Sequence, residues 1–189
     1  MKKINLEELL TGDLVAVGNG TSDFSTAIVA SNNISTRSYD HVGLVEKQGD
    51  AIFIWNANPK WGVVGESWQD FLSREEESGE RAFHFYRLKE HADFGMALKR
   101  IHSWEGLPYN YSFIRTDGAF YCSDLIGRAF PEGIFKSRPM KFGGDFWTVY
   151  YDDLDLPIPD GEPGFHPADM VQQENMRCLG AYKGERNKT

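Results

Sequence analysis

The chain has 189 residues, 41 % of them hydrophobic and 14 % aromatic, which suits a single domain over residues 1–189 with a sizeable core. Its 20 Lys and Arg residues are outnumbered by 28 Asp and Glu residues, and the resulting formal charge of −8 argues against a nucleic-acid-binding surface. The basic run Lys183–Lys188 is expected to be a solvated terminus.

The first residues carry no targeting signal. "MKKINLEELLTGDLV" (1–15) lacks an apolar segment after its two lysines, and no run in the chain is long enough to cross a membrane. We therefore expect a cytoplasmic protein with no integral membrane segment, or a periplasmic or cell-surface protein if a leader is removed. Nothing in the composition indicates an oligomeric state.

Residue periodicity predicts several elements. Ser22 or Asp23 can cap the first helix, and Ser67 with Asp70 occupies capping-box positions at the start of a helix whose exposed face is expected to be acidic. The predicted elements are strands over 12–18 and 81–88, and helices over 22–31, 67–77 and 92–104.

A β-hairpin is predicted for "HVGLVE" (41–46) and "AIFIWNA" (51–57), joined by "KQGD" (47–50). A turn centred between Gln48 and Gly49 pairs residues whose numbers sum to 97. His41 then faces Asn56 on the buried side of the hairpin, at a Cβ separation of about 4.5–5.5 Å. The other pairs in this register are Val45 with Ile52 and Gly43 with Ile54.

The chain after residue 131 is rich in Gly, Pro and aromatic residues, and we expect it to form surface loops and short strands. The aromatic stretch "FGGDFWTVYY" (142–151) is interpreted as core residues on short strands, or as the lining of an apolar acyl pocket. The whole pattern predicts an α+β domain with a helix-first half and an antiparallel sheet.

Cys122 stands just ahead of an apolar stripe at helical spacing, so it falls on the inward face at the start of a helix. The stripe consists of Leu125, Ile126, Ala129 and Phe130. A helix N-terminus favours a thiolate and offers N–H groups to an oxyanion, although a buried, inert cysteine is the common alternative. A disulfide between Cys122 and Cys178 is possible, but nothing in the sequence requires one. No metal-ligand or cofactor motif occurs, so we expect neither a metal nor a cofactor.

A nucleophilic cysteine needs a base, and the chain has five histidines. His84 and His102 lie in patterned segments and favour structural roles, whereas His91 and His166 are expected to contact solvent. His41 is distinguished by its predicted partner Asn56. The alternative is that His41 and Asn56 only satisfy each other's hydrogen-bonding groups in the core and have no catalytic role.

Four motifs in order resemble those of a known family. They are "YDHVGLVE" (39–46), "IWNANPKWGV" (54–63), "GLPYN" (106–110) and "YCSDLI" (121–126). Together they resemble the YiiX/YebB-like branch of the NlpC superfamily, which comprises circularly permuted papain-like cysteine hydrolases. The resemblance covers roughly residues 10–170 and implies a permuted papain-like fold in which a helix packs on an antiparallel sheet.

The resemblance also implies roles for individual residues. Cys122 matches the nucleophile, His41 the general base and Asn56 the third polar position, where many permuted members have glutamate. Tyr109 matches the tyrosine whose hydroxyl helps form the oxyanion hole. Tyr121 and Ser123 flank the nucleophile at substrate-binding positions, where this chain departs from the unpermuted Asp-Cys-Ser-Gly pattern.

These roles imply hydrolysis of an amide bond through a thioester intermediate, with a small peptide or acyl-amide as substrate. The family relationship suggests a cell-wall (peptidoglycan) peptide. Two alternatives stay open: a lipid amidase or acyltransferase related to lecithin–retinol acyltransferase, and an inactive member that binds a ligand without turnover.

Overall fold

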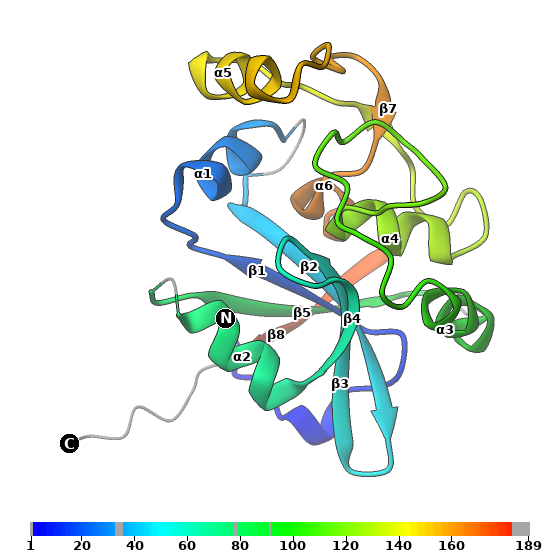
Figure 1. Cartoon of the computed structure of the whole chain (residues 1–189). Helices are drawn as coiled ribbons and strands as arrows, with labels where there is room; N and C mark the ends of the chain where they lie inside the picture. The colour runs from blue at the N-terminus through cyan, green and yellow to red at the C-terminus, as the bar shows by residue number, and fades with distance from the viewer. Residues whose placement is uncertain (1, 33–35, 78, 91, 183–189) are drawn as a thin grey trace.

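The computed structural model describes residues 2–32, 36–77, 79–90 and 92–182 (Figure 1). The expected basic terminus Lys183–Lys188 and His91 lie outside these ranges. A six-stranded antiparallel sheet has the strand order β4-β3-β2-β1-β5-β8. Its strands are β1 (Leu14–Gly18), β2 (Tyr39–Gln48), β3 (Ala51–Asn58), β4 (Gly62–Ser67), β5 (Ala82–Leu88) and β8 (Met176–Tyr182), and a separate pair is formed by β6 (Arg138–Pro139) and β7 (Pro163–Gly164).

Helices cover both faces of the sheet unequally. In Figure 1, α2 lies on one side, whereas α1, α4, α5 and α6 lie on the other. The helical elements are η1 (Leu6–Glu8), α1 (Asp23–Ala30), α2 (Trp68–Glu76), α3 (Phe94–Ser103), α4 (Cys122–Ala129), α5 (Asp145–Leu154) and α6 (Pro167–Val171).

Residue alternation along the central strands creates two cores. Leu14 and Val42 point into a large core with α4, and Val15 and Val45 point into a small core with Phe71 of α2. Both faces of β1 are therefore buried, which explains why its sequence is apolar throughout instead of alternating.

The predicted hairpin is confirmed, but its predicted register is wrong. Val45 pairs with Ile54 and Leu44 with Trp55, so paired residue numbers sum to 99 and not to 97. The cause is a two-residue turn in which Gly49 takes the left-handed conformation (φ 61°). A shift of two residues preserves the faces, so the expected common face of the hairpin survives the error.

The predicted helices and strands of the first half are largely confirmed. Ser22 caps α1, and the Ser67 hydroxyl caps α2 by accepting the Asp70 N–H at 3.2 Å. The mixed helix and antiparallel-sheet class is also confirmed. The expectation of a helix-first half is wrong, because β1–β5 all precede residue 89 and four of the helices follow it.

The aromatic stretch 142–151 is not strand but largely helix α5. Trp147 and Tyr151 are four residues apart and are both buried, so the stretch has a helical period that its high β-propensity hides. Among the described residues, no helix is both long enough and apolar enough to cross a bilayer.

Leu125 fixes α4 on the sheet, since it is fully buried in the large core. We expect Leu125→Ala to lower the free energy of unfolding by about 2–5 kcal/mol, because it leaves a cavity between helix and sheet. Urea denaturation followed by circular dichroism measures this. Val149→Ala on the exposed face of α5 is the control, with an expected change within about 0.5 kcal/mol. Equal losses in the two variants would contradict the packing described here.

Candidate active site

Cys122 is the first residue of α4, and its thiol is buried against β2. The backbone N–H groups of Val42 and Ser123 lie close enough to the sulfur to favour its charged form. Burial nevertheless outweighs their effect and raises the pKa of the Cys122 thiol to about 12. Burial therefore favours the protonated thiol at neutral pH, in spite of the position of Cys122 at the helix N-terminus.

His41 and Asn56 meet as the sequence predicted: His41 Nε2 and Asn56 Oδ1 are 3.1 Å apart. The Asn56 Nδ2 group donates to Glu66 Oε2 at 2.8 Å, which leaves Oδ1 as the acceptor. His41 must then carry its proton on Nε2. Its Nδ1 lone pair takes no hydrogen bond within the described residues.

A buried carboxylate lies beside this pair. Glu75 Oε1 is 3.9 Å from His41 Nε2, and Glu75 is held by Arg74 at 2.8 Å and by Arg81 at 3.2 Å. Burial lowers the pKa of His41, and the charge of Glu75 partly opposes that effect. Glu75 thus provides the negative charge that Asn56 lacks.

Glu75 was not predicted as a functional residue, because the acidic residues of this helix are expected on its exposed face. Trp68, Phe71 and Glu75 recur at helical spacing, and all three are buried. That spacing was a signal available in the sequence, since a carboxylate in an apolar stripe must be paired if it is buried.

The cysteine and the histidine lie on opposite faces of the sheet. The His41 ring stacks on Phe71 in the small core, with centroids 6.1 Å apart, whereas Cys122 belongs to the large core. Among the described residues, no hydrogen bond joins Cys122 to His41. The sulfur contacts the N–H of Val42, the residue directly after His41, so it lies against the strand segment that carries the imidazole.

The β2–β3 ladder does not extend as far as Val42. The last β2–β3 pair in the described structure is Leu44 with Trp55. Beyond it, β2 continues beside β1, with Val17 opposite His41, and β3 continues beside β4, with Asn56 opposite Val64. The N–H of Val42 is thereby available to the sulfur of α4 and is not used in a β2–β3 ladder.

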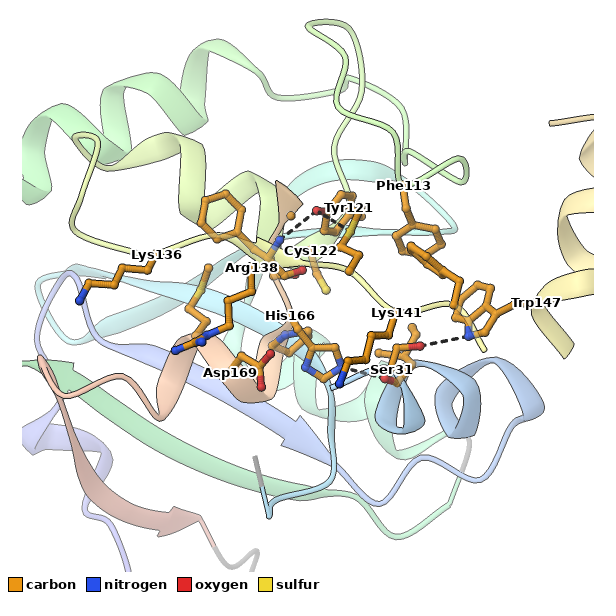
Figure 2. Close-up of a pocket in the computed structure, with 18 of the residues that line it drawn as sticks. Ser31, Phe113, Tyr121, Cys122, Lys136, Arg138, Lys141, Trp147, His166 and Asp169 are labelled. Carbon is orange, nitrogen blue, oxygen red and sulfur yellow. Dashed lines mark hydrogen bonds between the residues drawn. The ribbon is translucent and has the colours of Figure 1, made fainter. Parts of the chain in front are cut away.

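A narrow cavity of about 40 Å³ adjoins Cys122 and is also lined by Tyr109, Tyr121 and Ser123 (Figure 2). Burial raises the pKa of Tyr109 well above its ordinary value, so its hydroxyl keeps its proton as a donor. The Tyr121 hydroxyl accepts the Phe165 N–H at 3.2 Å, and the Ser123 hydroxyl donates to the Phe165 carbonyl at 2.9 Å. Tyr121 and Ser123 therefore fix one wall of the cavity as well as lining it.

His166 is only partly buried, so some of the expected contact with solvent remains. It lines the same cavity, with Nδ1 accepting the Ala168 N–H at 3.1 Å and Nε2 donating to the Ile28 carbonyl at 2.7 Å. Both ring nitrogens are engaged, and burial lowers the pKa of His166. This histidine caps α6 and has no free lone pair for a proton. This capping role of His166 could not be predicted from the sequence, because the residue follows a loop that is rich in Gly and Pro.

Cys122 and Cys178 are both free thiols, and Cys178 is exposed. His102, expected to be structural, contacts Glu46 at 3.0 Å and packs on Trp55. In the part of the chain that the structure describes, no group of three or more His, Cys, Asp or Glu side chains is arranged to hold a metal ion.

Comparison with known proteins identifies a matching family and a similar fold. A family model described as permuted papain-like amidase enzyme, YaeF/YiiX, C92 family, matches residues 19–180. The fold is similar to that of a crystal structure titled metalloprotein yiiX from Escherichia coli O157:H7, with a TM-score of 0.72 and 15 % sequence identity over 90 % of this chain and 96 % of that one. No curated protein matches the chain. The predicted resemblance and the papain-like permuted fold are confirmed, and the chain belongs to the C92 family of permuted papain-like cysteine amidases.

Proposed function

We propose that this protein hydrolyses an amide bond through a thioester formed on Cys122, with His41 as general base and Asn56 as the residue that orients it. One observation carries the proposal. Asn56 holds the His41 ring by Nε2 and leaves the Nδ1 lone pair unbonded, while the Cys122 sulfur lies against the neighbouring Val42 N–H.

The resting pair is neutral in this proposal. Burial raises the pKa of the Cys122 thiol and lowers that of His41, so neither group is charged near pH 7. As the sulfur attacks the substrate carbonyl, its proton passes to His41 Nδ1 and an S–C bond forms. Attack requires the His41 ring, which packs on Phe71 in the small core, to reach the sulfur on the large-core face of the sheet. The imidazolium that forms is stabilised by Glu75 and by the carbonyl oxygen of Asn56.

The tetrahedral oxyanion needs donors, and two are proposed. The backbone N–H of Cys122 lies in the first turn of α4, where such groups have no intrahelical acceptor, and the Tyr109 hydroxyl lines the cavity beside it. His41 then gives its proton to the departing amine as the C–N bond breaks. Water attacks the thioester, its proton returns through His41 to the sulfur, and a carboxylic acid is released.

The substrate class follows from the family and from the cavity. Amidase membership implies a peptide-type substrate, and a cell-wall peptide is the proposed source. The lipid amidase or acyltransferase alternative is supported by the apolar lining, which includes Phe113, Phe142 and Trp147. A cavity of about 40 Å³ holds only a few water molecules and suits a small group better than a whole acyl chain. This favours the peptide.

The nucleophile is tested with a cysteine-directed alkyne probe and peptide mapping by mass spectrometry, together with hydrolysis of a panel of acyl-amino acid anilides. We expect Cys122→Ala to abolish hydrolysis and labelling at this position, and Cys178→Ala to keep hydrolysis within about twofold of the parent protein, because Cys178 is exposed and outside the cavity. Full hydrolysis by Cys122→Ala would overturn the proposal. Binding of anilides without turnover by the parent protein would favour the inactive alternative.

Glu75 provides a test of the base. Glu75→Gln removes a charge 3.9 Å from His41 Nε2 without changing the side-chain volume. Because Glu75 raises the pKa of His41, its removal should move the acid limb of the kcat/KM profile to lower pH and reduce kcat by about tenfold, since the imidazolium loses a stabilising charge.

The matched control is Glu76→Gln, the exposed next residue of α2, which changes the net charge equally. Its pH profile should coincide with that of the parent protein. A shift of the acid limb in the Glu76 variant, or an unmoved limb in the Glu75 variant, would exclude His41 beside Glu75 as the titrating base.

A further inference from the structure

Three cations gather at the cavity that adjoins Cys122. Lys136, Arg138 and Lys141 all line it, and in the view of Figure 2 Arg138 and Lys141 lie on either side of Cys122. Among the described residues, none of these three side chains forms an ion pair or donates a hydrogen bond to a protein group. The Nε of Arg138 is buried without any partner.

Arg138 differs from Arg115 and Arg177, which also form no ion pair among the described residues, because those two are exposed and Arg138 is partly buried. Four other arginines each contact a carboxylate at 3.0 Å or less: Arg74, Arg81, Arg87 and Arg128. Carboxylates are also in excess, since the chain has 28 acidic and 20 basic residues. A buried guanidinium nitrogen without an acceptor costs free energy. Arg81 Nε is also unpaired, but the other nitrogens of Arg81 bind Asp40 and Glu75, whereas those of Arg138 have no partner among the described residues and lie beside a cavity that an outside acceptor can enter.

The segment that carries the cations is held in place on both sides. The Lys136 N–H donates to Gln173 Oε1 at 3.0 Å, and the Met140 N–H donates to the Glu162 carbonyl at 2.8 Å. The charges are therefore presented by a fixed backbone before a ligand arrives, which reduces the entropy lost on binding.

One opposing charge is present. Asp169 is buried in the wall of the cavity and has interactions of its own. Three cations against one carboxylate leave the lining positive, although the chain as a whole is negative. The guanidinium of Arg138 can hold both oxygens of a carboxylate with a parallel pair of hydrogen bonds, which an ammonium group cannot do.

We propose that the cavity takes an amide substrate whose bound part is a small apolar group ending in a carboxylate, held by Arg138 with Lys136 and Lys141 around it. This inference rests on the proposed amidase function and names its substrate class. A phosphate shares the same oxyanion chemistry and would come from a lipid headgroup. The small cavity volume favours the carboxylate of a short peptide-like substrate.

The test is ligand binding that does not need turnover, measured by saturation-transfer NMR on the full chain, both unaltered and as Cys122→Ala. Butyrate is the probe, butyramide is its uncharged analogue, and propyl phosphate represents the lipid source. We expect butyrate to bind at least tenfold more tightly than butyramide and than propyl phosphate. Arg138→Gln should weaken butyrate about tenfold and leave butyramide unchanged.

Lys99→Gln is the matched control, because Lys99 is an exposed cation on α3 outside the cavity lining and its loss changes the net charge equally. It should leave butyrate binding unaltered. Equal binding of butyrate and butyramide, or equal effects of the Arg138 and Lys99 variants, would overturn the inference. Tighter binding of propyl phosphate than of butyrate would overturn the carboxylate assignment.

The same experiment separates the inference from the proposed function. If Cys122→Ala still hydrolyses anilides yet butyrate binds as expected, the nucleophile is wrong and the anion site stands. If Cys122 proves to be the nucleophile but Arg138→Gln has no effect on butyrate, the amidase stands and the substrate class is wrong.

Discussion

The site depends on a single hydrogen bond between His41 Nε2 and Asn56 Oδ1. Asn56 cannot reverse its amide, because its Nδ2 group is committed to the carboxylate of Glu66 and its oxygen also receives Arg74 at 3.3 Å. The carboxamide therefore dictates which imidazole nitrogen carries the proton. The ion-pair network beneath α2 thus determines the tautomer of His41, the base of the proposed mechanism.

Burial is the second constraint, and it favours the uncharged form of both Cys122 and His41. It disfavours the thiolate of Cys122 and the imidazolium of His41, so the pair rests uncharged in spite of the helix N-terminus. An uncharged thiol is a weak nucleophile, so the proposed mechanism needs a base that removes its proton during attack. In the proposed mechanism, the sulfur becomes reactive when a substrate brings it and His41 together. The negative charge of Glu75 would then stabilise the imidazolium that forms during attack.

The secondary structure could be predicted from the sequence where the apolar residues repeat with a single helical or strand period. The strands that cross the buried sheet, the capped helices and the ordered motifs around His41, Asn56 and Cys122 were recognisable, and even a register error of two residues preserved the shared face of His41 and Asn56. What escaped prediction depended on tertiary burial. Glu75 looked like one more acid on a solvated helix, and the cationic lining of the cavity is spread along a loop that has no regular period. Only the folded chain shows that the first is enclosed and that the second faces the sulfur.

The tautomer and charge of His41 provide the most direct test, measured by ¹⁵N NMR of the imidazole in protein labelled at histidine, with His41→Gln identifying the resonances. The account predicts that the His41 ring at pH 7.5 is neutral with its proton on Nε2, and that it titrates below the ordinary histidine range. A proton on Nδ1, or an imidazolium that persists above pH 7, would contradict it, because His41 would then have no lone pair to offer the Cys122 thiol.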